Sequence, residues 1–342
     1  HTKEVLMNDI RRTILWVIFG FSLVMLWDQW QVSNGHKPTF FPSHTATQAA
    51  GPTNASSASN GVPTAAAPAA TAATGASAIA GNVPQAAAAA THERVTVQTD
   101  VLKLVFDTEG GSIVQSEFLT YSDKADPSRP VMLLDDSKER VYLAQSGLIA
   151  GAGGPALPTH KSVMTLQPGE RTLKDGSDSL SLRFESADVG GVKLVKTYTL
   201  TRGSYAVAVK HDIINTGSVP VAPQLYLQLV RDGIKPPGES SFYSTFTGPA
   251  VYTGAKKYQK VEFADIDKNK VDIEKASSDG YVAMVQHYFA SAWLLGDGIK
   301  RDLFVRKVDA NLYSVGMIAP LETIAPGASK TLEARFFAGP QE

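Results

Sequence analysis

The chain has 342 residues, and its 32 Lys and Arg nearly balance its 33 Asp and Glu, so its formal net charge is −1. A nearly neutral chain lacks the basic surface that proteins use to bind nucleic acids, and we predict no nucleic-acid partner. The sequence contains no Cys, which excludes disulfides, thiolate metal sites and a cysteine-linked lipid anchor. Stability must therefore come from burial alone.

An uncharged apolar segment near the N-terminus predicts one transmembrane helix over residues 10–30. The run TILWVIFGFSLVMLW covers residues 13–27 and follows two arginines directly. With its flanks the helix reaches about 20 residues, enough for a hydrocarbon core of ~30 Å. Basic residues before the helix predict that residues 1–9 stay in the cytoplasm and the large C-terminal part is exported. We expect the membrane-anchor residues to be Arg11, Arg12, Trp16, Phe19, Phe21, Trp27 and Trp30.

A cleaved secretory signal is the alternative reading of this segment, because it also has basic residues followed by an apolar core. Small residues are needed just beyond that core, whereas Asp28 and Gln29 follow here. The anchor is therefore favoured. Residues 1–6 precede the first Met and are expected to be a tag or a misassigned start.

Residues 31–92 are predicted to be a disordered, low-complexity linker. No Asp, Glu, Lys or Arg occurs between Pro38 and His92, and Ala, Thr, Ser, Gly and Pro dominate. Such a segment buries too little apolar surface to offset the entropy of ordering. An alanine-rich helix is the alternative, and Pro63, Pro68 and Pro84 argue against it.

The remaining residues, 93–342, are predicted to form a mainly β domain with little helix. Apolar residues alternate with polar ones, and Val, Leu, Tyr and Phe are enriched. Turn signals every 8 to 20 residues are typical of a sandwich or barrel. Residues 151–158 and 236–258 are predicted to be long loops of the kind that bind partners. The predicted strands include 102–106, 179–185, 192–200, 205–214, 224–230, 281–295, 303–308, 312–318 and 331–337. Asp188, Gly190 and Gly191 separate residues 179–185 from 192–200, which predicts a hairpin there.

Motifs for catalysis or metal binding are missing from the sequence. It contains no HExxH, P-loop, GxSxG or strand-linked GxGxxG pattern, so we predict no catalytic residue, cofactor or metal. His211 and His287 are the candidates for a ligand-binding cleft. His211 shares a strand face with Val207 and Val209, and His287 joins an aromatic stripe if residues 281–295 are one strand. Structural histidines remain the favoured reading of both.

A short basic run lies at the end of the second predicted loop and just beyond it. Lys256, Lys257 and Lys260 surround Tyr258. They indicate either a contact site for an acidic partner or an ordinary solvated face, and the second reading is favoured because the run is short.

Several separated blocks resemble the YidC family of bacterial inner-membrane protein insertases, within the Oxa/Alb superfamily. Apart from the linker, the resemblance extends along nearly the whole chain, with the blocks in the family's order. The blocks are MNDIRRTILWVIFGFSLVMLWDQWQ at residues 7–31, TDVLKLVFDTEGGSI at 99–113, YLAQSGL at 142–148, KTYTLTRGSYAVAV at 196–209, GYVAMVQHYFASAWL at 280–294 and FFAGPQE at 336–342.

The resemblance implies a periplasmic β-supersandwich, similar to galactose mutarotase, attached to the inner membrane. It implies an insertase and chaperone for integral membrane proteins, acting alone or with the Sec translocon. The implied partners are nascent membrane proteins, the lipid bilayer and the translocon subunits SecD and SecF. It also implies that FFAGPQE leads into the insertase membrane core, so the groove of that core lies beyond Glu342.

Two other hypotheses stay open at the level of sequence. The first is a membrane-tethered carbohydrate-binding protein or aldose epimerase, which needs a His and a carboxylate converging in a cleft. His211 or His287 would then be the acid. The second, a scaffold without a small-molecule ligand, is compatible with an insertase role.

Overall fold

The computed structural model describes residues 61–64, 91–124, 126–236 and 245–341, and within them it confirms the mainly β prediction. These residues form nineteen strands and one short helix, α2 (Phe263–Asp267). The predicted membrane anchor and most of the predicted linker lie outside the described residues. Within the described ranges, no helix has the length and apolarity needed to cross a membrane.

The first sheet contains ten strands in its described part, and every pairing within it is antiparallel. In spatial order its main strands are β1 (Arg94–Gln98), β2 (Leu102–Asp107), β3 (Ser112–Ser122), β6 (Val141–Ile149), β11 (Gln224–Asp232), β18 (Leu312–Pro320), β17 (Arg301–Asp309) and β14 (Ala276–Ser277), with β4 (Pro130–Met132) on β3 and β5 (Asp135–Asp136) on β6.

The second sheet contains nine described strands and is also antiparallel. In spatial order its strands are β13 (Lys257–Lys260), β12 (Thr247–Thr253), β15 (Tyr281–Gln286), β16 (Phe289–Leu295), β19 (Ser329–Pro340), β10 (Ala206–Asn215), β9 (Val192–Thr201), β8 (Ser179–Ser186) and β7 (Met164–Leu166).

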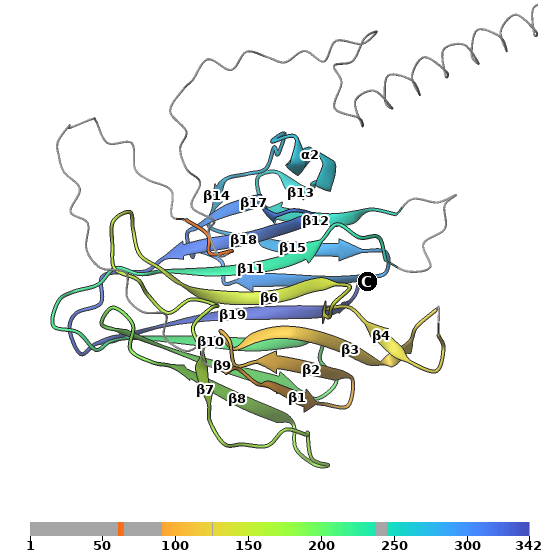
Figure 1. Ribbon diagram of the computed structural model, residues 1–342, viewed down its shortest axis with the longest axis horizontal. Coiled ribbons are helices and arrows are strands. Elements are labelled where there is room, and N and C mark those ends of the chain that lie inside the picture. Colours follow the sequence, from red (N-terminus) through yellow and green to blue (C-terminus); the bar gives the residue numbers. More distant parts are fainter. Residues whose placement is uncertain (1–60, 65–90, 125, 237–244, 342) are drawn as a thin grey trace, which may run out of the picture. The chain divides into compact units, whose positions relative to one another are not determined.

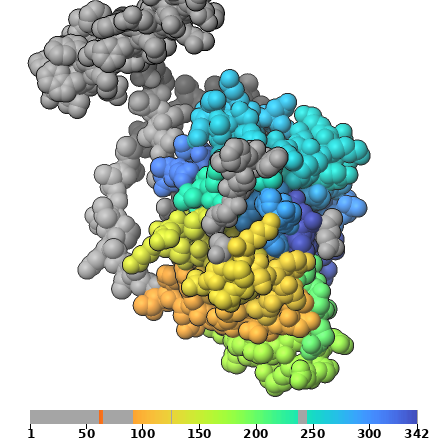
Figure 2. All heavy atoms as spheres, turned by 90° about the vertical axis from the view of Figure 1, so that its right-hand side faces the viewer, coloured from red at the N-terminus to blue at the C-terminus, as the bar shows by residue number. Residues whose placement is uncertain are grey.

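The two sheets pack face to face around one large apolar core. Hydrogen bonds also cross between the layers: the Tyr142 hydroxyl donates to the Met284 carbonyl oxygen at 3.1 Å, and Trp293 Nε1 donates to the Gln228 carbonyl oxygen at 3.0 Å. The ends of the sheets correspond, with β13 and β14 beside α2 at one end and β1, β7 and β8 at the other (Figure 1). Figure 2 shows the same separation from a second side, with the cyan residues around α2 at one end and the orange and green residues of β1 and β8 toward the other.

Strict alternation explains why the predicted hairpin of β8 and β9 is confirmed. Leu180, Leu182 and Phe184 are buried, and the residues between them point outward. The turn lies next to Gly190, whose φ is +63°. An added Cβ would lie 2.2 Å from the Ala156 carbonyl oxygen, so only glycine fits there.

Two other sequence predictions in the second sheet are wrong. Residues 281–295 form the hairpin β15–β16 rather than one strand, with a turn at His287 and Tyr288. His287 has a φ of +42°, a conformation that the sequence does not announce because no Gly or Asn stands there. The predicted loop 236–258 contains all of β12 and the first two residues of β13.

Candidate binding pocket

An apolar hollow lies on the outer face of the second sheet. Strands β15 and β16 send Val282, Met284 and Trp293 into the core between the sheets. The residues between these on the same strands point to the opposite face and form a second apolar cluster. An antiparallel sheet normally exposes polar side chains on the face that it does not bury. The outer face here is instead apolar.

Small side chains make the floor of this hollow. Ala283 on β15 lies directly opposite Ala292 on β16, and Val285 lies opposite Ala290. Cross-strand neighbours at this spacing would fill the surface if they were large. Because three of the four are alanines, the sheet surface is recessed.

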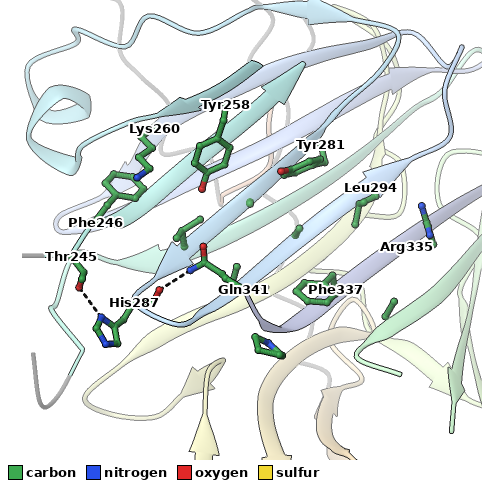
Figure 3. A pocket seen from close by; sticks show the side chains of 16 residues that line it. Thr245, Phe246, Tyr258, Lys260, Tyr281, His287, Leu294, Arg335, Phe337 and Gln341 are labelled. Atoms are coloured by element: carbon green, nitrogen blue, oxygen red, sulfur yellow. Dashed lines mark hydrogen bonds between the residues drawn. The ribbon is translucent and has the colours of Figure 1, made fainter. Parts of the chain in front are cut away.

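Aromatic side chains form the walls of the hollow. Phe246, Tyr258 and Tyr281 lie on one side and Phe337 on the other, around a volume of about 620 Å³ (Figure 3). Sites for small apolar ligands or side chains typically have a volume of this order. The pocket is thus large enough to accept a cluster of apolar side chains.

The charged groups at the pocket are cationic. Lys260 Nζ lies 5.1 Å from the centre of the Phe246 ring, where the ring face attracts the ammonium group. Arg335 also lines the pocket, and no Asp or Glu occurs among its described lining residues. Desolvation raises the pKa of both Tyr258 and Tyr281, so their hydroxyls stay neutral. An apolar ligand with carbonyl or carboxylate oxygens suits these walls.

His287 lies at the rim of the pocket and joins three segments. Its Nδ1 lies 3.1 Å from Thr245 Oγ1, and its carbonyl oxygen accepts a hydrogen bond from Gln341 Nε2 at 3.0 Å (Figure 3). The backbone N–H of Gln341 donates to the Tyr288 carbonyl oxygen at 2.7 Å. The last described residue of the chain is therefore attached to the β15–β16 turn.

His211, the other candidate from the sequence, lies between the sheets rather than in the pocket. It is fully buried, as its shared face with Val207 and Val209 indicates, and its Nε2 lies 3.0 Å from Ser146 Oγ. Lys196 is buried beside it and donates hydrogen bonds to the carbonyl oxygens of Gly110 at 2.6 Å and Ser146 at 2.7 Å. Desolvation lowers the pKa of Lys196 to about 7. Desolvation, followed by the nearby Lys196, lowers the pKa of His211 to about 3.

The structure divides the basic run of residues 256–260. Tyr258 and Lys260 line the pocket, whereas Lys256 and Lys257 are exposed outside it, and Lys256 Nζ lies 3.7 Å from Asp272 Oδ1. The sequence did not indicate Phe246, Arg335 or Phe337 as site residues. A usable signal was the nearly continuous apolar content of residues 281–295, which is typical of a strand covered on both faces. The predicted anchor residues, from Arg11 to Trp30, lie outside the described residues.

Solved structures to which the chain is similar include a putative aldose 1-epimerase and a galactose mutarotase-like protein. A putative aldose 1-epimerase from Escherichia coli is 13% identical, and the match covers 73% of this chain and 100% of that one, with a TM-score of 0.45. A galactose mutarotase-like protein from Clostridium acetobutylicum is 8% identical, and the match covers 73% of this chain and 99% of that one, with a TM-score of 0.47.

The chain is much more similar in sequence to curated membrane protein insertases. A membrane protein insertase YidC from Cupriavidus pinatubonensis is 50% identical over 334 residues, covering 98% of this chain and 58% of the relative. The YidC protein of a Janthinobacterium species is 46% identical over 336 residues, with the same coverage of both chains. The chain thus spans less than two thirds of these relatives. The family model described as the YidC periplasmic domain matches residues 94–342. The chain therefore belongs to the YidC family.

Proposed function

We propose that this chain is the membrane anchor and periplasmic portion of a non-enzymatic insertase and chaperone of the bacterial inner membrane. The parent protein would assist insertion, folding and assembly of integral membrane proteins, alone or beside the Sec translocon. Support comes from family membership and from the name that the curated relatives carry. Lowering the cost of moving polar flanks across lipid needs no covalent chemistry.

The apolar pocket carries the more specific part of this proposal. Its recessed alanine floor and aromatic walls suit apolar side chains, and its two cations suit backbone carbonyls or a carboxylate. Pro340 and Gln341, the last two described residues, also line it. We propose that apolar segments of client membrane proteins contact the pocket as they emerge near the bilayer.

Photocrosslinking in living cells tests this contact. A photoreactive amino acid replaces Leu294, which lines the pocket, in the full-length parent protein. The control position is Ser181, which is exposed on β8 of the same sheet and away from the pocket. Newly made membrane proteins should be captured from position 294 and not from position 181. Equal capture from both positions would exclude the pocket as the client site.

Depletion of the parent protein tests the insertase role separately. Pulse-labelled membrane proteins should then stay inaccessible to protease added from the periplasmic side. Full insertion after depletion would contradict the proposal whatever the pocket binds.

Association with SecD and SecF is proposed from the resemblance alone. The full-length protein, tagged and purified in mild detergent, should bring both subunits with it. Removing most of residues 94–342 while keeping the C-terminal end should abolish this recovery if the β domain is the docking module. Unchanged recovery would place the contact elsewhere in the parent.

An epimerase role finds no support in the pocket. That chemistry needs an acid and a base facing one sugar, yet His211 lies in the core and the described lining residues include no carboxylate. Titration calorimetry with aldoses should show no binding.

A further inference from the structure

A short piece of the predicted linker, Gly61–Thr64, lies against the outer face of the first sheet. Val62 packs against a small apolar cluster made of Ile149, Tyr226 and Ile318. Pro63 is buried, whereas Thr64 is exposed. Burial of a proline within so polar and alanine-rich a segment is unexpected from composition.

Polar side chains of the sheet hold the backbone of this segment. Arg306 Nη2 donates to the Gly61 carbonyl oxygen at 2.7 Å, and its Nη1 donates to the Val62 carbonyl oxygen at 3.4 Å. Gln228 Nε2 donates to the same Gly61 oxygen at 2.9 Å. Gln228 points to the outer face of β11 and is fully buried. An amide on the outside of a sheet is expected to be solvated, so its burial points to a covering segment.

The segment also has a sequence requirement. Gly61 has a φ of +71°, a conformation that favours glycine. A Cβ there would lie 3.5 Å from His160 Nε2, so the backbone passes close to that ring. Proline fixes its own φ and lowers the entropy lost on docking. The combination Gly-Val-Pro therefore fits this site better than the Ala-Thr-Ser sequence around it.

We propose that Gly61–Pro63 is a docking peptide and that the surface around Arg306, Gln228 and Tyr226 is its recognition site. The docked peptide attaches the linker to the face opposite the apolar pocket, because the pocket lies on the outer face of the other sheet. Docking shortens the chain between the predicted anchor and its first attachment to the domain from residues 31–92 to residues 31–60.

Because the chain has no Cys, single introduced thiols report docking directly. In the full chain, Ile318→Cys places a thiol under Val62. Val62→Asp should release the segment and increase the rate of maleimide labelling at position 318 by about tenfold or more. Thr64→Asp is the matched control, because Thr64 is exposed and the change should leave the rate unaltered. If the thiol at position 318 is labelled at the same rate with and without the Val62→Asp substitution, the proposal is overturned.

A second set of reporters places the thiol in the docked segment itself. Pro63→Cys should be labelled about tenfold more slowly than Thr64→Cys, and Arg306→Gln should remove most of that difference. Pro63→Cys removes the docked proline itself. Val62→Cys keeps that proline and therefore serves as a parallel reporter. Equal rates at positions 62, 63 and 64 with Arg306 intact would also overturn the proposal. Circular dichroism of each variant verifies that the sheets stay folded.

Discussion

The contacts of individual buried polar residues cannot be read from the sequence. His211 shares a strand face with Val207 and Val209, and it is buried as that face indicates; Lys196 is buried beside it on the neighbouring strand, although it was not among the residues predicted from the sequence. Periodicity cannot show that they meet Ser146 from the other sheet, since that contact depends on how the sheets are stacked. The polar cluster in the core is therefore a property of the tertiary fold alone.

His211 should make the domain sensitive to acid. Its pKa is about 3 in the folded state and about 6.5 when unfolded, so the unfolded chain binds more protons between these pH values. Stability from this residue is thus present above pH 6.5 and is lost as pH falls toward 3, by at most about 1.4 kcal/mol per pH unit. His211→Gln removes the titration, and urea unfolding at pH 7, 5 and 4 should show a shallower loss. If the free energy of unfolding falls equally with pH in the unsubstituted and His211→Gln proteins, the prediction is contradicted.

Gly280 should be among the least replaceable residues of the second sheet. Its φ is +82°, and an added Cβ would lie 1.9 Å from the Tyr252 carbonyl oxygen. Gly280→Ala should lower the free energy of unfolding by about 3 kcal/mol or more, because both the conformation and the contact oppose a side chain. Gly298→Ala is the control, since Gly298 has a φ of +84° with no atom within 4 Å, and it should cost about 1 kcal/mol. Equal losses on urea unfolding would show that the contact relaxes.

At the scale of elements, one hairpin was predicted because its turn contains glycine, and another was missed because its turn does not. The β8–β9 hairpin was predicted because Gly190 and Gly191 interrupt the alternation. The β15–β16 hairpin was missed because His287 adopts a positive φ in the middle of an apolar run. Tertiary bonds from Thr245 and Gln341 hold that turn, and no local pattern encodes them.

Replacing His287 should expose the strain in this turn. His287→Gly should raise the free energy of unfolding by up to about 1 kcal/mol, since glycine adopts the observed φ without a Cβ penalty. His287→Ala, which keeps the Cβ but loses the imidazole, should not stabilise. Thermal unfolding of the two variants measures the difference, and a gain shared by both would assign the effect to the side chain instead.

For the whole molecule, the residue pattern predicted a sandwich or barrel and the family resemblance implied a sandwich, but neither predicted the pocket. Alternation shows which residues share a face, but it does not show which outer face is hollow. The pocket arises because β12, β15, β16 and β19 lie side by side, which brings Phe246, Ala283 and Phe337 together from distant parts of the chain. Burial of apolar side chains on both faces of β15 is the feature that distinguishes this region from β8.

Filling the pocket should block it without unfolding the domain. Ala292→Trp places a large ring in the hollow of about 620 Å³, where its neighbours leave room. Binding of anilinonaphthalene sulfonate, an apolar anion that suits the aromatic walls and the two cations, should weaken by about tenfold or more. Ser181→Trp on the exposed side of β8 is the control and should leave dye binding unchanged. Fluorescence titration measures both, and unaltered binding in Ala292→Trp would show that the dye, and by extension an apolar client segment, binds elsewhere on the domain.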